Sequence, residues 1–191
     1  IYFDAVVNST RQLKLGAVAQ LAALKPTGDP KLDRKIDEII GSIERSLDPD
    51  LWEDDDHLDP RHGGKVFHED GLAIGDLMRQ LRAVSLPEQV EEVFRGVTLL
   101  LLGTDEVLAR IAINDAVAAG GNPGEIEKAE AEMANAQMDR DAGQYDKAVG
   151  HYKKAWEHAQ RAVRGGGHQS AGVSTAPRVF VLHQNYPNPF S

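Results

Sequence analysis

The sequence contains no cysteine, which excludes disulfide bridges, thiolate metal ligands and cysteine nucleophiles. It also lacks long apolar runs. No purely apolar run is longer than Leu99 to Leu102, whereas a bilayer-spanning helix needs roughly 20 such residues. Basic side chains are fewer than acidic ones, at 21 against 30, which gives a net charge of −9. Repulsion between this negative charge and phosphate groups disfavours binding to nucleic acids. We therefore expect protein partners, cations or surfaces, with no nucleic acid and no membrane span.

Aromatic residues are also scarce, at 6 % of the chain, while alanine, leucine and charged residues are common. This composition suits a helical protein better than a sandwich or a barrel. A chain of 191 residues is long enough for one buried core with appendages. The chain opens at Ile1 without methionine or a signal peptide, so we expect a mature or excised fragment of a longer protein.

Apolar residues recur at helical spacing along most of the chain. Asp29-Pro30 reads as a cap with a first-turn proline, Ser85 to Glu88 as a capping box, and Gly120 to Pro123 as the end of one helix and the cap of the next. The predicted helical segments are 13–24, 32–47, 72–84, 90–119, 126–143 and 145–163. Short connections imply antiparallel neighbours, so we predict an all-α, up-and-down bundle of about six helices over residues 1–164.

Two segments fall outside this helical pattern at the C-terminal side. Glycine and serine in residues 165–177 predict a flexible linker, because these residues have little side chain to anchor a segment. Residues 178–191 begin with a β-prone apolar run and predict a short extended segment.

A long acidic loop interrupts the bundle from Asp48 to Gly64. We favour a solvated loop with Trp52 inserted into the core. A calcium site is an alternative, because Ca²⁺ prefers carboxylate and carbonyl oxygens, although the spacing differs from that of an EF-hand. A zinc site is a further alternative. The calcium ligands would be Asp54, Asp55, Asp56 and Asp59; the zinc ligands would be His57, His62 and His68 with an aspartate.

Catalysis has little support in the sequence. Two facing carboxyls from Asp54, Asp56 or Glu69 could serve glycoside hydrolysis, but a chain this rich in acids always offers such pairs. No nucleophile elbow, phosphate-cradling glycine loop or dinucleotide fingerprint occurs. We therefore expect a non-enzymatic protein that needs no cofactor, with calcium as the one ion to consider.

Three stretches resemble known families. The last helical hairpin, with Gly143, Tyr145, Ala148, Tyr152 and Ala155, resembles a tetratricopeptide repeat, but its first helix has polar residues where large apolar ones are usual, and no second copy follows. Residues 30–164 resemble an uncharacterised helical module of secreted prokaryotic proteins, which implies an extracellular setting and no particular activity.

The C-terminal run resembles the opening strand and turn of the sorting domain that directs bacterial proteins through type IX secretion. The residues of this run are Val179, Phe180, Val181, Leu182, Gln184, Asn185, Tyr186, Pro187, Asn188, Pro189 and Phe190. The resemblance implies a secreted or cell-surface location, with these residues acting in sorting or assembly.

Taken together, these features predict a non-catalytic structural or assembly module of a larger secreted protein. Its apolar C-terminal run would dock on its own bundle or on another chain, and head-to-tail docking between copies would give filaments or rings. A calcium-dependent or carbohydrate-facing binding module is the alternative, and a hydrolase with its site in the acidic loop is the third.

Overall fold

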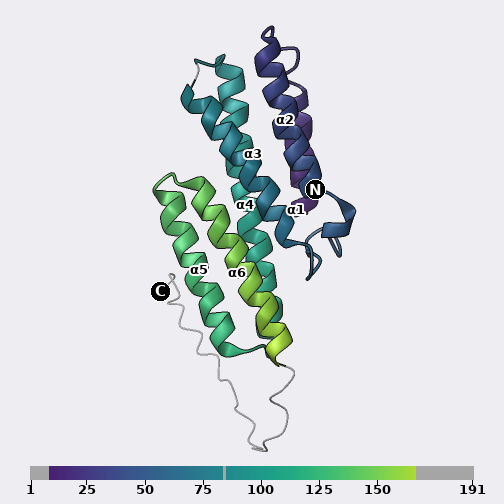
Figure 1. Ribbon diagram of the computed structural model, residues 1–191, viewed down its shortest axis with the longest axis vertical. Helices are drawn as coiled ribbons and strands as arrows, with labels where there is room; N and C mark the ends of the chain where they lie inside the picture. The colour runs from purple at the N-terminus through teal and green to yellow at the C-terminus, as the bar shows by residue number, and fades with distance from the viewer. Residues whose placement is uncertain (1–8, 84, 167–191) are drawn as a thin grey trace, which may run out of the picture.

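The chain folds into six α-helices and one short 3₁₀ turn within the described residues of the computed structural model, 9–83 and 85–166 (Figure 1). No strand occurs in these ranges, and the predicted all-α class is confirmed. The elements are α1 Thr10–Ala22, α2 Pro30–Ser46, η1 Pro49–Leu51, α3 Gly64–Ala83, α4 Glu88–Ala118, α5 Pro123–Asp141 and α6 Tyr145–Gly166.

The helices are arranged as two hairpins on a central pair (Figure 1). The long helix α4 and its neighbour α3 run through the middle of the molecule. The hairpin α1–α2 packs on one end of this pair, with α2 on α3 and α1 on α4. The hairpin α5–α6 packs toward the other end, and α6 contacts both α3 and α4. None of the helices in the described ranges is long and apolar enough to cross a bilayer.

Local sequence explains where most helices begin. Asp29 accepts a hydrogen bond from the Lys31 N–H at 2.8 Å, and proline occupies the first position of α2, as predicted. Asn122 caps α5 in the same way. The predicted capping box at Ser85 is wrong, because α4 begins only after Pro87 and has no side-chain cap. A cap at Ser85 would make Leu86 the first residue of the helix, but Pro87 disfavours the helical conformation in the residue before it.

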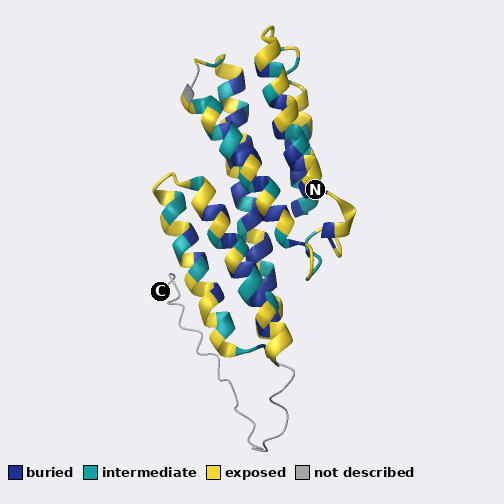
Figure 2. Cartoon of the chain, in the orientation of Figure 1, coloured by how far each residue is buried: buried dark blue, intermediate teal, exposed yellow. Residues whose placement is uncertain are grey.

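The core is built from the apolar stripes of the helices, and Figure 2 shows buried positions along the inward faces. In α2 the stripe includes Ile36, Ile39 and Ile43, each fully buried. Gly121 permits a close approach between the α4–α5 turn and α6, since a Cβ atom there would lie 3.1 Å from the Ala162 carbonyl oxygen of α6. One continuous core therefore joins both hairpins to the central pair.

The C-terminal segments fall mostly outside this description. Helix α6 extends to Gly166, two residues into the range predicted as linker. The rest of the predicted linker, the extended segment 178–191 and the apolar residues 1–3 lie outside the described residues.

Candidate functional site

The acidic loop is held against the bundle by its tryptophan. Trp52 is only 7 % exposed, and its indole N–H donates to the Ser46 carbonyl oxygen at 2.8 Å. Trp52 also forms an isolated antiparallel bridge with Leu58, which is itself buried. The prediction that Trp52 enters the core is confirmed, and the loop between 48 and 63 has a defined path because both of its apolar anchors are buried.

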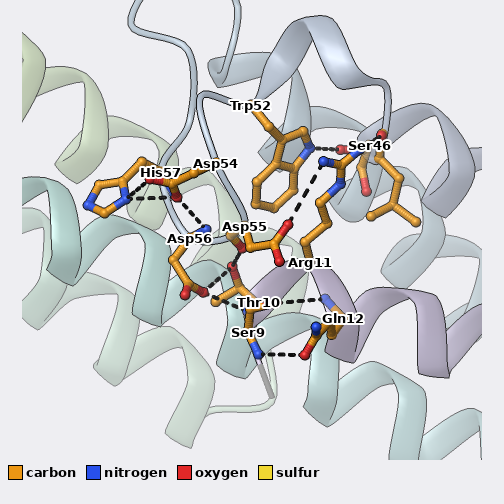
Figure 3. Close-up of polar contacts among 11 residues, drawn as sticks. Ser9, Thr10, Arg11, Gln12, Ser46, Trp52, Asp54, Asp55, Asp56 and His57 are labelled. Carbon is orange, nitrogen blue, oxygen red and sulfur yellow. Dashed lines mark hydrogen bonds and ion pairs between the residues drawn. The ribbon is translucent and has the colours of Figure 1, made fainter. Parts of the chain in front are cut away.

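The loop also ties down the start of α1 (Figure 3). The Asp56 carboxylate accepts hydrogen bonds from the Thr10 backbone N–H at 2.7 Å and from the Thr10 hydroxyl at 3.0 Å. The Asp55 carbonyl oxygen accepts from the Arg11 N–H at 3.2 Å. The first N–H groups of a helix have no partner within the helix, so the loop supplies acceptors to them. Asp56 therefore has a structural role at the N-terminus of α1.

Two further loop aspartates fold the loop on itself. Asp54 accepts from the N–H groups of Asp56 and His57, and its carboxylate lies 2.8 Å from His57 Nδ1. These bonds lower the pKa of Asp54, and the Asp54 contact raises the pKa of His57. Asp59 accepts from the N–H groups of residues 61 and 62, which likewise lowers its pKa. Each carboxylate is thus directed toward backbone donors nearby in the sequence.

The four predicted calcium ligands are accordingly turned to separate partners, as Figure 3 shows for Asp54, Asp55 and Asp56. In residues 9–83 and 85–166, no three or more histidine or acidic side chains are grouped so that they could hold a metal ion. A calcium ion at this loop stays a prediction, and its binding would require these side chains to turn from the partners they have here. The other candidates are dispersed as well, with His62 beside Asp59 and Glu69 paired to Arg45.

A buried charge cluster, which the sequence analysis did not identify, lies in the core between α1, α3 and α4. The Lys14 ammonium contacts the Asp70 carboxylate directly and lies 4.0 Å from Asp105 Oδ1. All three side chains have 0 % exposure. The ammonium also lies 5.5 Å from the centroid of the Trp52 ring, a distance suited to a cation–π contact. The loop and the charge cluster therefore meet at Trp52.

The cluster contains one lysine and two acids, and the electrostatics separate the roles of the acids. Burial raises the pKa of the Asp105 carboxyl well above its usual range, and the adjacent Asp70 raises it further, while Lys14 opposes both. A neutral Asp105 beside a Lys14–Asp70 ion pair leaves no net charge in the core. With every side chain fully buried, substrates do not reach these groups, so the cluster acts in stability rather than in surface chemistry.

Helical phase is the sequence signal that could have revealed this cluster. Lys14 shares a face with Ala17 and Leu21, which are core residues of α1. Asp70 and Asp105 are likewise in phase with core residues of their own helices. Asp70 lies four residues before the buried Ile74, and Asp105 lies three residues before the buried Leu108. A charged residue in phase with an apolar stripe is buried if the stripe is. Which of these charges pair across helices depends on tertiary packing.

Polar contacts also join α5 to α6. His151 of α6 contacts Glu132 and lies 3.4 Å from Asp139 Oδ2, both on α5. His158 lies 2.7 Å from Glu125 farther along the same pair of helices. Histidines of α6 therefore meet acidic side chains of α5 at two places along this pair of helices.

In comparison with known proteins, no family model, no curated protein and no solved structure matches this chain.

Proposed function

We propose that this chain is a non-catalytic structural and assembly module of a larger secreted or cell-surface protein. The observation that carries the proposal is the use made of the acidic loop, the segment with the most potential ligands and acids. Its aspartates accept hydrogen bonds from backbone groups of the loop and of α1, and its tryptophan fills the core. A loop whose polar groups are engaged in this way serves the rigidity of the bundle.

A rigid bundle with buried charges suits a spacer or scaffold. The Lys14–Asp70–Asp105 cluster joins three helices, and removing one member of a buried ion pair is costly, so alternative packings of the helices are disfavoured. Within the described residues the acids proposed for hydrolysis do not face one another: Asp54 contacts His57, Asp56 contacts Thr10 and Glu69 contacts Arg45. These contacts favour a structural role over hydrolysis.

The proposed location rests on the resemblance of residues 179–190 to a type IX sorting domain. Fractionation of the native host tests it, with antibodies against the bundle. We expect the protein in the extracellular medium or on the outer surface. Confinement to the cytoplasm would refute the location and with it the secreted module.

The proposed assembly role rests on the apolar character of Val179 to Leu182, a β-prone run that gains hydrogen bonds by pairing with another strand. Light scattering of the full chain and of a variant ending at residue 164 tests this role. We expect the full chain to have a mass above that of the monomer, and this mass to rise with protein concentration. We expect the shortened chain to stay a monomer. Monomers in both samples would refute assembly through the C-terminal run while leaving the location open.

A further inference from the structure

An open cleft lies between the first turn of α3, the residues just before it, and the last turns of α6. Its volume is about 520 Å³, within the roughly 300–1,000 Å³ typical of small-molecule sites. Trp156 from α6 and Gly64 from α3 line it, and the residues around it come from two parts of the chain that are far apart in the sequence.

The close packing of α3 on α6 shapes this cleft. A Cβ atom on Gly63 would lie 2.5 Å from the Leu58 Cβ and 3.2 Å from the Trp156 ring, so a larger residue does not fit there without a shift of the chain. Gly64 lies against the same ring, where an added Cβ atom would be 3.5 Å away. The glycine pair thus brings the positive N-terminal end of α3 close to α6.

The lining is strongly basic, in contrast to the net charge of −9 of the chain. Five of the lining residues are lysine or arginine, and Glu157 is the acid among them. The basic residues are Arg61, Lys65, Lys153, Arg161 and Arg164; His62 and His68 also line the cleft. A concentration of positive charge on an acidic protein attracts anions to one place on its surface.

Internal partners neutralise only part of this charge. The Lys153 ammonium lies 4.0 Å from Glu157, and the Arg161 guanidinium lies 3.2 Å from Glu125. Arg164 donates to the Pro60 carbonyl oxygen at 2.7 Å, which fixes the guanidinium without cancelling its charge. Arg61 and Lys65 form no ion pair with any residue of 9–83 or 85–166 and are exposed at the cleft. Three cations therefore remain to bind an anion.

We propose that this cleft binds a compact ligand carrying two or more phosphate or sulfate groups. Lysine and arginine bind such oxyanions through charge-assisted hydrogen bonds, and the guanidinium fork matches their geometry. A tetrahedral oxyanion presents oxygens in several directions, so cations from the α3 side and from α6 can contact it together. Two linked groups match the excess charge better than one. The ligand is either a free phosphorylated compound or a sulfated sugar.

Isothermal titration calorimetry of the full chain tests the proposal with two probes. The first is inorganic pyrophosphate, compared with orthophosphate; the second is a disulfated disaccharide, compared with its unsulfated parent. We expect saturable binding with one site for at least one probe, and about tenfold weaker binding for its comparison compound. Binding of pyrophosphate indicates a phosphorylated ligand, and binding of the sulfated sugar alone indicates a carbohydrate source.

Variants locate the binding. Arg61→Gln and Lys65→Gln each remove one uncompensated cation from an exposed position, so each is expected to weaken binding about tenfold without unfolding the protein. Lys154→Gln is the matched control, because Lys154 is exposed on α6, carries the same charge and is not among the residues that line the cleft. Its affinity is expected to stay within about twofold of the parent protein.

Three results would overturn the proposal. The first is no saturable binding of either probe at millimolar concentration. The second is an equal loss of affinity in Lys154→Gln and Lys65→Gln, which would mean that only overall charge attracts the anion. The third is tighter binding of citrate than of both probes, which would identify a carboxylate ligand instead.

Discussion

The buried charge cluster predicts that two aspartates beside the same lysine respond very differently to the same substitution. Asp70→Asn removes the counter-ion of a fully buried ammonium. Breaking a buried pair in this way costs about 3–5 kcal/mol of the free energy of unfolding. Asp105→Asn replaces a carboxyl that burial keeps neutral with a neutral amide of nearly the same shape, so its cost is expected to stay within about 1 kcal/mol.

Urea denaturation followed by circular dichroism measures both values, and thermal unfolding provides a second reading. For a chain of this size, 3–5 kcal/mol corresponds to a fall of about 6–20 °C in the unfolding midpoint. The double variant completes the cycle. We expect it to lose more than the sum of the single variants. In Asp70→Asn the remaining acid, Asp105, lies 4.0 Å from the ammonium and can ionise, which recovers part of the lost attraction and places that variant at the lower end of its range.

The pH dependence follows from the direction of the Asp105 shift. Its pKa in the folded protein is raised above the usual aspartate value of 3.8, so the folded state keeps a proton that the unfolded chain releases. The stability contributed by Asp105 is therefore complete below about pH 3.8 and is lost as the pH rises toward the folded pKa. Asp105→Asn lacks this loss, so its stability relative to the parent protein should improve from pH 4 to pH 7.

The reasoning would be refuted if Asp105→Asn destabilised the protein as much as Asp70→Asn at neutral pH. That result would mean that Asp105 also carries a negative charge that Lys14 balances. Equal and small costs for both variants would show that solvent reaches the cluster, since an exposed ion pair contributes only about 0–1 kcal/mol.

The remaining predictions concern the loop and the α5–α6 contacts. Trp52→Ala should cost about 3–5 kcal/mol in urea denaturation, because it empties a core position and leaves a carbonyl oxygen without its donor; a cost below 1 kcal/mol would mean that the loop does not pack as described. Asp56→Ala should cost about 1–2 kcal/mol and speed hydrogen exchange in the first turn of α1, whereas unchanged exchange there would contradict its role as an acceptor. Contacts with Lys128 and His158 lower the pKa of Glu125 from 4.5 to about 2, so the stability that Glu125 contributes is present above pH 4.5 and is lost as the pH falls toward 2. Glu125→Gln should therefore flatten the plot of stability against pH between these values. An unchanged slope in the variant would argue against these contacts. Millimolar Ca²⁺ should leave the unfolding midpoint unchanged, and a rise of several degrees would restore the calcium site at the loop.

Periodicity located the six helices because each buries one apolar stripe, although α3 begins at Gly64, eight residues before the predicted segment 72–84. The stripe from Leu32 to Leu47 lies in α2, and the aromatic and alanine positions after Tyr145 lie in α6. The predicted caps at Asp29 and Asn122 also form, since a cap depends on residues within one turn. Local interactions of this kind are encoded in a few neighbouring residues, so they can be read without knowing the rest of the fold.

The features of the candidate sites were decided by tertiary structure. Asp56 lies 46 positions after Thr10, Asp70 lies 56 positions after Lys14, and Arg164 lies 104 positions after Pro60, yet each pair is in contact. The sequence identified the loop acids as a group, whereas the fold directs them to separate donors. In the sequence, the basic residues of the cleft are scattered charges on an acidic chain, and the packing of α3 on α6 brings them together. Helical phase determines which side of a helix faces inward, but only the packing of helices determines which partner each polar group meets there.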